Sequence, residues 1–306
     1  MKAKTQPSFE APQEISQIKI WLVAARLKTL TAGVIPVLIG VALARAIVGK
    51  VDWIAAFLTL ACSILIQIGI NLINDVMDFK KGADNDLRIG FKRVVQSGLI
   101  SPKTVLKAGL FCFALALLFG IPLIFQSGWL LLFVLLISIS LGYMYTGGPF
   151  PLAYYGLGDI FAFIFFGLVI TVTAFYVQTG FVDYKSLLAG AQIGCLATVI
   201  MAINNFRDIA CDAKVNKRTL AVLFGPLFCR LEITIASLAP FMIGLLWGQL
   251  GHPLAAALPC LALPFAWANI RAFWSFDPSP LYNQLFIRST FIHLLFGILL
   301  ILGYLL

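Results

Sequence analysis

Residues 108–125 read AGLFCFALALLFGIPLIF, and residues 129–142 read WLLLFVLLISISLG. Neither run contains a charged residue. A helix needs about 20 consecutive apolar residues to cross the hydrocarbon core of a bilayer. The strands of a transmembrane barrel would instead alternate apolar and polar residues over about 10 positions. The two runs therefore predict membrane-spanning helices.

The composition of the whole chain agrees with this interpretation. Of the 306 residues, 61% are hydrophobic and 11% are charged, and the mean hydropathy is +0.98. A soluble domain is about 45–50% apolar and about 25% charged. Soluble, disordered, collagen-like and nucleic-acid-binding proteins are thereby excluded. We expect one membrane domain over residues 1–306, because the connections are too short to form a soluble domain. Residues 1–18 form a polar cytosolic segment without the apolar core of a signal peptide.

Apolar segments of sufficient length predict nine membrane spans. They cover residues 21–47, 52–74, 105–125, 129–146, 153–177, 186–204, 220–247, 253–273 and 285–306. The first and the seventh are longer than a bilayer requires. We expect these two to tilt, to kink at Pro36 or Pro240, or to continue into the cytosol.

The distribution of charge predicts the topology. The net charge is +9. When the N-terminus is placed in the cytosol, all but three of the 22 Lys and Arg residues fall on the cytosolic side. The exceptions are Arg45, Lys50 and Lys185. This excess of Lys and Arg on one side therefore favours nine spans. A basic surface of this kind would also bind anionic membrane lipid.

Two similar acidic segments follow the second and the sixth predicted spans. Residues 71–81 read NLINDVMDFKK, and residues 204–214 read NNFRDIACDAK. In each, an Asn-x3-Asp pattern is followed one turn later by a second Asp and then by basic residues. Residues at i, i+4 and i+7 or i+8 share one face of a helix. The pattern predicts one polar column from Asn71, Asp75 and Asp78 and another from Asn204, Asp208 and Asp212.

The residue types in these columns indicate a magnesium and diphosphate site. Two facing carboxylate clusters repel each other unless cations lie between them, and Mg²⁺ is a hard cation that is usually shared with phosphates. Neither segment contains histidine, which argues against zinc. Basic side chains that could complete a phosphate pocket are Arg88, Lys92, Arg93, Arg207, Lys217 and Arg218. At a membrane surface, such a site suggests a diphosphate attached to a lipid tail. Asp84 and Asp86 fit either this site or a solvated loop.

The sequence resembles the UbiA superfamily of intramembrane prenyltransferases, and within it the 1,4-dihydroxy-2-naphthoate polyprenyltransferases. The similar stretches are RLKTL at 26–30, NDVMDFKKGADN at 74–85, RIG at 88–90, VQSGLI at 95–100 and NNFRD at 204–208. YTGGPFPLAYYGLGD at 145–159 and KRTLAV at 217–222 point to the naphthoate branch. The chain departs from that branch at Leu27 and Phe91, where proline is usual, and at Asn216, where glycine is common.

The resemblance implies nine transmembrane helices around a central cavity, capped by cytosolic loops and open sideways to lipid. It implies transfer of a polyprenyl group from polyprenyl diphosphate to 1,4-dihydroxy-2-naphthoate. The products would be demethylmenaquinol, pyrophosphate and carbon dioxide. The location implied is a bacterial inner membrane, with the N-terminus and the active site on the cytoplasmic side.

The resemblance also implies roles for individual residues. Two Mg²⁺ ions would be held by Asp75, Asp78, Asp208 and Asp212, supported by Asn71 and Asn204. The diphosphate would be bound by Arg88, Lys92, Arg207, Lys217 and Arg218. The acceptor would be bound by Arg26, Lys28, Tyr143 and Tyr145, although the two basic residues could equally be membrane anchors. Asp159 would orient the acceptor hydroxyl or act as a base, or would only cap a helix.

Two rival interpretations stay open at this point. The enzyme could prenylate another aromatic ring, such as 4-hydroxybenzoate or homogentisate. A secondary transporter would also use charged residues and internal repeats, but its repeats are often inverted and its charges lie at the membrane midplane. Here the acidic segments are expected at one surface and in the same orientation, which favours the enzyme.

Overall fold

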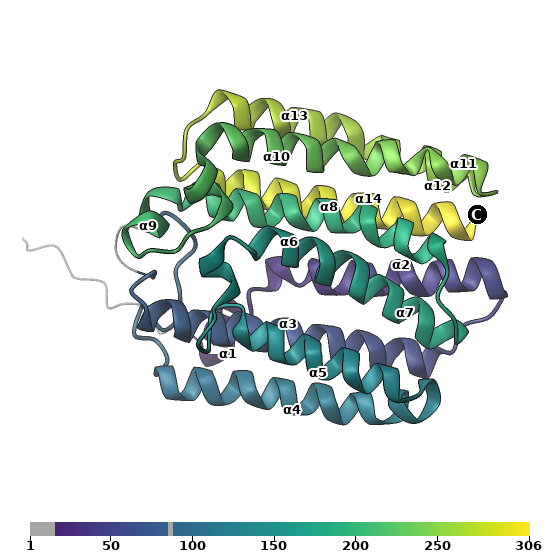
Figure 1. The fold of residues 1–306 in the computed structure, drawn as a ribbon, viewed down its shortest axis with the longest axis horizontal. Coiled ribbons are helices and arrows are strands. Elements are labelled where there is room, and N and C mark those ends of the chain that lie inside the picture. Colours follow the sequence, from purple (N-terminus) through teal and green to yellow (C-terminus); the bar gives the residue numbers. More distant parts are fainter. Residues whose placement is uncertain (1–15, 85–87) are drawn as a thin grey trace, which may run out of the picture.

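The computed structural model describes residues 16–84 and 88–306, so Asp86 lies outside the described residues. The long helices run side by side as one bundle (Figure 1). They are α2 (Thr31–Val48), α3 (Trp53–Lys80), α4 (Pro102–Ser127), α5 (Trp129–Met144), α8 (Tyr184–Arg207), α10 (Leu220–Gly244), α13 (Leu263–Ser275) and α14 (Tyr282–Leu305). The chain is an all-helical membrane protein.

Shorter helical pieces complete or connect these helices. Three of them, α6 (Gly158–Phe163), the π-helical η3 (Ile164–Val169) and α7 (Ile170–Thr179), follow one another as a single span. The others are α1 (Gln17–Ala25), η1 (Leu27–Thr29), η2 (Leu152–Tyr155), α9 (Ile209–Lys214), α11 (Leu246–Gln249), α12 (Pro253–Ala257) and η4 (Leu258–Ala262).

All nine predicted apolar segments are helical within the described part of the chain. Eight of them are long and apolar enough to cross a membrane. The fourth, Trp129–Met144, is a shorter apolar helix of 16 residues, about 24 Å long at 1.5 Å per residue. Hydropathy therefore located the spans correctly, and the differences from prediction lie at their ends.

The ends of three predicted spans were wrong. The first span begins at Thr31, because residues 17–29 form α1 and η1 as a separate segment before it. The fifth begins at Gly158, so that Tyr154 lies in the preceding loop. The second continues to Lys80, which keeps its acidic residues on the helix. Apolar loop residues misled the prediction at the first two positions.

The break in the seventh span lies at a different residue from the one predicted. Within α10 the backbone leaves helical geometry at Gly225, whose φ is +79°. Pro226 follows directly, and proline disfavours a helical conformation at the residue before it. A kink at Pro240 was one of the alternatives expected for this span, and the break that the structure shows lies at Gly225. Gln192 of α8 instead donates a hydrogen bond of 2.7 Å to the Pro240 carbonyl oxygen.

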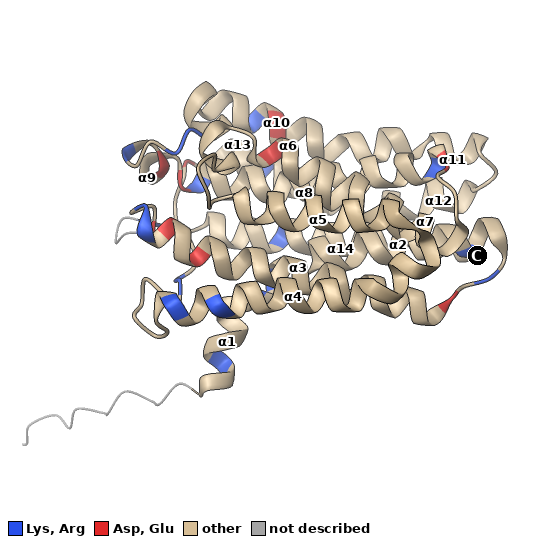
Figure 2. Cartoon of the chain, turned by 60° about the horizontal axis from the view of Figure 1, so that its bottom comes forward, with Lys and Arg blue, Asp and Glu red and all other residues tan. Residues whose placement is uncertain are grey.

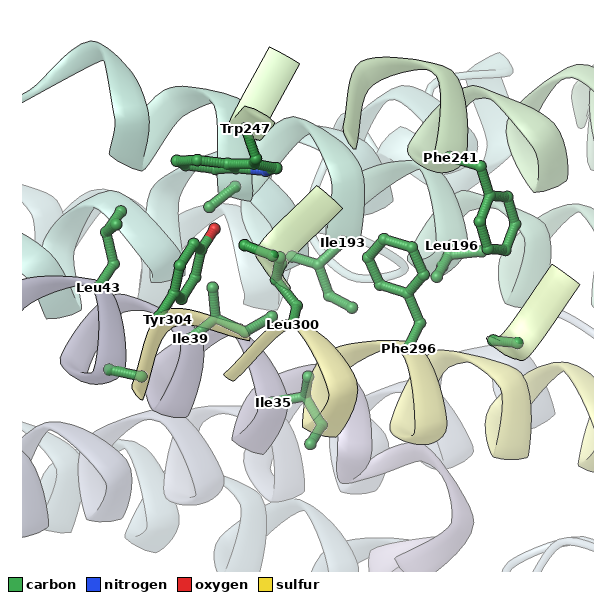
Figure 3. Close-up of a cluster of buried hydrophobic side chains, with 14 of the residues drawn as sticks. Ile35, Ile39, Leu43, Ile193, Leu196, Phe241, Trp247, Phe296, Leu300 and Tyr304 are labelled. Atoms are coloured by element: carbon green, nitrogen blue, oxygen red, sulfur yellow. The ribbon is translucent and has the colours of Figure 1, made fainter. Parts of the chain in front are cut away.

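One half of the bundle is closely packed. A cluster of buried side chains joins α2, α8, α10 and α14, and Figure 3 shows Phe296, Leu300 and Tyr304 of α14 facing Ile39 and Ile193. Glycines allow a second close contact between η3 and α8. A Cβ atom on Gly167 would lie 2.5 Å from the Gly190 carbonyl oxygen. Small residues at helix contacts are a usual means of association within membranes.

Charged residues gather at one end of the bundle. Figure 2 shows most Lys, Arg, Asp and Glu residues near α1, α9 and the adjoining ends of α3 and α4, with few at the opposite end. The acidic ends of α3 and α8 lie at this charged end. The structure thus brings together the two acidic segments, which are far apart in the sequence.

Candidate active site

A cavity of about 530 Å³ is lined by residues that include Asp75, Asp78 and Arg88 at the charged end of the bundle. Its walls come from α2, α3, α5, the α6–α7 span and α8. Asn71, Asp75 and Asp78 line it at the charged end, and Thr59 and Cys62 line it further along α3. From Asp75 to Thr59, α3 rises about 24 Å at 1.5 Å per residue. The cavity therefore joins a polar end to a long and largely apolar interior.

The first acidic segment forms the polar column that the sequence predicts. α3 is continuous through Lys80, so Asn71, Asp75 and Asp78 lie on the same face and all three line the cavity. Asp75 Oδ2 accepts a hydrogen bond of 3.2 Å from the Val94 backbone nitrogen, whereas Asp75 Oδ1 is buried without a hydrogen-bond partner. Asp78 Oδ1 accepts a hydrogen bond of 3.1 Å from the Tyr154 hydroxyl.

The second acidic segment does not form a single helical column, and that prediction was wrong. α8 ends at Arg207, Asp208 adopts φ −96° and ψ 10°, and a new short helix, α9, begins at Ile209. Asp208 is instead paired with arginine. Arg207 Nε and Nη2 donate to its two carboxylate oxygens at 3.0 and 2.7 Å. Although burial acts to raise it, these Arg207 interactions hold the pKa of Asp208 below its usual value.

Asp212 forms the other ion pair of this segment. Lys217 Nζ, whose residue lines the cavity, lies 3.3 Å from Asp212 Oδ1. Asp212 Oδ2 is buried without a hydrogen-bond partner. Burial raises the pKa of the Asp212 carboxyl to about 6, with Lys217 acting in the opposite direction. Asn216, just before this lysine, has a φ of +55°, a conformation that asparagine tolerates better than most residues.

Arg88 joins the loop after α3 to the second acidic segment. Its guanidinium contacts Asp84 Oδ1, and its Nη2 lies 3.7 Å from Asp208 Oδ2. Burial raises the pKa of Asp84 to about 6, with Arg88 acting in the opposite direction. Gly90 lets this loop approach closely, because a Cβ atom there would lie 2.4 Å from Arg207 Nη2. The loop after α3 is thereby fixed against the end of α8.

The predicted site residues divide into two groups. Those that line the cavity are Arg26, Lys28, Asn71, Asp75, Asp78, Arg88, Lys92, Arg93, Tyr145, Asn204, Arg207 and Lys217. Those that do not are Asp159, Asp208, Asp212, Arg218 and Tyr143. Asp208 and Asp212 still contact lining residues through Arg207 and Lys217. Arg218 is exposed, and Tyr143 is half-buried.

Asp159 does not cap its helix. α6 has no side-chain cap, and both Asp159 carboxylate oxygens accept hydrogen bonds from Asn205 Nδ2, at 3.1 and 3.0 Å. Asp159 is 2% exposed. Asn205 itself lines the cavity. The carboxylate therefore orients a neighbouring amide at the cavity wall.

Several contacts of the site were missed by sequence reasoning. Asn74 accepts a hydrogen bond of 2.7 Å from Thr146 Oγ1, and Lys81 Nζ donates to the Thr146 carbonyl oxygen at 2.7 Å. These bonds hold the loop before α6 against the end of α3. Asn283 accepts a hydrogen bond of 2.9 Å from Arg207 Nη1. The motif at 145–159 marked the loop, but no pattern marked Asn283.

The donor set fits a magnesium ion that is shared with a substrate. Among residues 16–84 and 88–306, no three His, Cys, Asp or Glu side chains come together as a metal-binding group. Mg²⁺ is usually held through one or two carboxylates together with substrate phosphates. Asp75 Oδ1 and Asp212 Oδ2 are buried carboxylate oxygens without a hydrogen-bond partner. A buried polar atom of this kind is costly unless a ligand satisfies it.

Comparison with known proteins identifies the family. Residues 33–303 match the model of the UbiA prenyltransferase family. A 1,4-dihydroxy-2-naphthoate octaprenyltransferase of Bacillus subtilis is 37% identical over 70% of this chain and 69% of its own. The protein of that name from Haemophilus influenzae is 32% identical over 94% and 97%. UbiA prenyltransferase domain-containing protein 1 of Xenopus tropicalis is 29% identical over 92% and 81%.

Solved structures of homologues have the same fold. A UbiA homologue from Aeropyrum pernix superposes with a TM-score of 0.68 at 16% identity, covering 89% of this chain and 97% of that one. A UbiA homologue from Archaeoglobus fulgidus, bound to DMAPP and Mg²⁺, superposes with a TM-score of 0.61 at 17% identity, covering 90% and 98%. The chain therefore belongs to the UbiA prenyltransferase family.

Proposed function

We propose that this UbiA-family prenyltransferase transfers a polyprenyl group from polyprenyl diphosphate to 1,4-dihydroxy-2-naphthoate, giving demethylmenaquinol, pyrophosphate and carbon dioxide. One observation carries the proposal: a single cavity joins a carboxylate- and guanidinium-lined end to a long apolar interior. A diphosphate with a prenyl tail has the same two parts. The names of the relatives that are 37% and 32% identical support the naphthoate acceptor.

The charged end would bind the diphosphate together with Mg²⁺. Asp75 and Asp78 lie on the cavity wall, and Asp208 and Asp212 lie directly behind it. With Asn71 and Asn204 nearby, these are the residues that would hold the metal. Bound Mg²⁺ would supply Lewis-acid neutralisation of the leaving diphosphate. A homologue from Archaeoglobus fulgidus was solved with DMAPP and Mg²⁺, which supports this arrangement.

Basic side chains would take the remaining charge of the diphosphate. Arg88, Arg207 and Lys217 line the cavity beside the two acidic segments. The allylic carbon–oxygen bond breaks with its electron pair leaving on the diphosphate, and cations fixed in place stabilise that charge as it develops. Lys92 also lines the cavity but is exposed, and Arg218 lies outside the lining, so we assign both a weaker contribution.

The apolar interior would hold the prenyl chain and exclude water from the reacting carbon. Side chains of α5 and the α6–α7 span, including Leu135, Phe165 and Val169, line it. Tyr145 also lines the cavity, and its hydroxyl donates to Met201 Sδ at 3.2 Å. Its ring is thus held at the cavity wall, where a cation–π contact would steady an allylic cation. The aromatic carbon then forms the new carbon–carbon bond, and the carboxyl group leaves as carbon dioxide.

The acceptor carboxylate would bind at Arg26. This residue and Lys28 line the cavity from the α1–α2 connection, on the same wall as Asn71. Lys28 is exposed, and its Nζ lies 4.5 Å from the ring centroid of Phe91. Arg26 is therefore the stronger candidate of the two. Tyr143 does not line the cavity, and we assign it no contact with the acceptor.

We further propose that the charged end faces the cytoplasm of a bacterial cell and that the N-terminus lies on that side of the inner membrane. The gathering of Lys and Arg at this end supports the orientation, because cytoplasmic loops carry an excess of both. In this orientation the polar substrates would reach the cavity from the cytoplasm, and the prenyl chain would reach it from lipid.

A second candidate keeps the reaction and changes the acceptor to 4-hydroxybenzoate or homogentisate. We keep it because the chain also matches a relative whose name specifies no acceptor, UbiA prenyltransferase domain-containing protein 1, at 29% identity over 92% of this chain. 4-Hydroxybenzoate also has a carboxylate for Arg26, but it is one ring smaller than the naphthoate. Acceptors compared side by side distinguish the two candidates.

The test uses the full chain, purified in detergent and supplied with farnesyl diphosphate and each acceptor in turn. Mass spectrometry should detect a prenylated, decarboxylated naphthoquinol with Mg²⁺, and none after EDTA until Mg²⁺ is restored. Asp78→Asn should abolish the product, whereas Asp277→Asn, at a carboxylate that is 93% exposed, should retain it. If 4-hydroxybenzoate is the only acceptor that gives a product, the assignment of the naphthoate as the acceptor is overturned. No product with any acceptor, from protein that elutes as a folded species, would overturn the function.

A further inference from the structure

The connection between α1 and η1 has an unusual backbone conformation. Arg26 has a φ of +54°, in the left-handed region. Among the described residues other than glycine, only Asn216 shares this feature. Asparagine visits the left-handed region readily, whereas arginine has no such tendency. Contacts around Arg26 must therefore hold the turn in place.

Two side chains supply those contacts. The Thr29 hydroxyl donates a hydrogen bond of 2.9 Å to the Arg26 carbonyl oxygen. Asn71 Nδ2 donates to the Ala25 carbonyl oxygen at 3.0 Å and to Thr29 Oγ1 at 3.1 Å. One hydroxyl and one amide thus bind the carbonyl groups on both sides of the strained position. Asn71, on α3, ties the turn to the wall that also carries Asp75.

The turn presents a guanidinium that forms no direct ion pair. Arg26 lines the cavity, and its Nη2 donates to the Asn71 backbone carbonyl oxygen at 3.3 Å. Arg88 and Arg207 each contact a carboxylate, but no carboxylate of the described chain lies within 4.0 Å of Arg26. A guanidinium has five N–H donors in a planar fork that matches a carboxylate. Arg26 is therefore prepared for an anion that enters the cavity.

We propose that Thr29 and Asn71 form a clamp that holds Arg26 in position for the carboxylate of the aromatic acceptor. The inference rests on the proposed function, and it adds Thr29 as a positioning residue and gives the Asn71 amide nitrogen a role apart from metal binding. Asn71 contacts the turn through Nδ2, which leaves its side-chain Oδ1 for the metal end of the cavity. The acceptor subsite and the metal subsite then share one side chain.

The anion at Arg26 could in principle be the acceptor carboxylate or the diphosphate. Asn71 lies one helical turn further from the charged end of α3 than Asp75 does. Arg88, Arg207 and Lys217 already surround the acidic segments. The acceptor carboxylate is therefore the better candidate for the anion that Arg26 binds. Separate KM values for the acceptor and for the diphosphate substrate distinguish the two anions.

The kinetic test compares Thr29→Val, which removes the hydroxyl at constant shape, with Thr29→Ser, which restores it. Thr31→Val is the matched control, because Thr31 Oγ1 is buried without a hydrogen-bond partner and the residue does not line the cavity. At saturating Mg²⁺, Thr29→Val should raise KM for the naphthoate about tenfold and leave KM for farnesyl diphosphate within about twofold. Thr29→Ser and Thr31→Val should resemble the wild type. An unchanged acceptor KM, or an equal rise for both substrates, would overturn the assignment.

A second measurement does not need catalysis. Thr29→Val should speed hydrogen exchange at the amides of residues 26–30, whereas Thr31→Val should leave this segment unchanged, since exchange reports local opening. Unchanged exchange in Thr29→Val would contradict the clamp. If exchange is unchanged but the enzyme still prenylates the naphthoate, the clamp is wrong and the proposed function is retained. If exchange is faster but the enzyme prenylates no acceptor, the clamp is retained and the proposed function is wrong.

Discussion

The two acidic segments share a sequence pattern but differ in structure. In residues 71–78 the carboxylates stand on one continuous helix and face the cavity, and Asp75 keeps an oxygen without a partner. In residues 204–212 the helix ends, and Asp208 and Asp212 are paired with Arg207 and Lys217 behind the cavity wall, although Asp212 also keeps an oxygen without a partner. Similar motifs therefore give two environments: carboxylates that face the cavity directly, and carboxylates that are paired with basic side chains behind its wall. The segments should differ accordingly when they are changed.

The largest expected effect compares Asp75→Asn with Asp208→Asn. Asp75→Asn removes a carboxylate that faces the cavity, and we expect kcat to fall about 10³-fold, as for the loss of a charge-stabilising group in an active site. Asp208→Asn should cost about tenfold less, because Arg207 and Arg88 already offset this charge. Steady-state kinetics at several Mg²⁺ concentrations measures both. Equal losses in the two variants would remove the functional distinction between the segments.

Arg207→Met should reduce stability more than any other change in the second segment. The side chain is 1% exposed and contacts Asp208, Asn204 and Asn283. Removal of one partner from a buried pair costs about 3–5 kcal/mol, because the other charge stays buried. Thermal unfolding in detergent should show a clearly lower Tm.

Arg230→Met is the matched control for that variant. Arg230 pairs with Asp277, whose side chain is 93% exposed, and pairs of this kind contribute less than about 1 kcal/mol. A fall in Tm as large as that of Arg207→Met would mean that burial does not set the difference.

Lys217→Met should weaken substrate binding in addition to any loss of stability from leaving Asp212 buried without its partner. Its Nζ lies 3.3 Å from Asp212 Oδ1, and the residue lines the cavity, so it can also reach the diphosphate. A charge-assisted hydrogen bond contributes about 2 kcal/mol, and we expect KM for the diphosphate to rise about thirtyfold. Binding of farnesyl diphosphate by calorimetry provides an independent measurement. Unchanged affinity would assign Lys217 to Asp212 alone.

The smallest expected effect is that of Tyr154→Phe in the first segment. It removes the hydroxyl that donates to Asp78 Oδ1 at 3.1 Å and keeps the ring under Lys81. Loss of one such bond costs about 1 kcal/mol, so kcat should fall about fivefold, with a matching rise in the Mg²⁺ concentration needed for half activity. Tyr155→Phe is the control, because Tyr155 is 50% exposed and lies outside the cavity lining. If both variants behave alike, the bond to Asp78 contributes nothing.

Sequence reasoning succeeded where a residue's environment follows from its neighbours along the chain. Hydropathy located the nine helices, and helical spacing placed Asn71, Asp75 and Asp78 on one face. It failed where a contact between distant segments decides the structure. The break at Asp208 belongs to a network that reaches Asn283, 76 residues beyond Arg207, and no local pattern encodes that contact. The same is true of Asn71 and the Arg26 turn, which are joined across 46 residues.

Gly90 illustrates how a contact between distant segments limits the substitutions that a position tolerates. Any side chain there must displace the end of Arg207, which would lie 2.4 Å from the new Cβ atom and is held by several hydrogen bonds. In a saturation library selected for growth, Gly90 would tolerate as few alleles as Asp75, although it has no side chain to contribute to the reaction. The Tm would separate the two, because Gly90→Ala must displace Arg207 from its hydrogen bonds, whereas Asp75→Asn leaves those bonds in place.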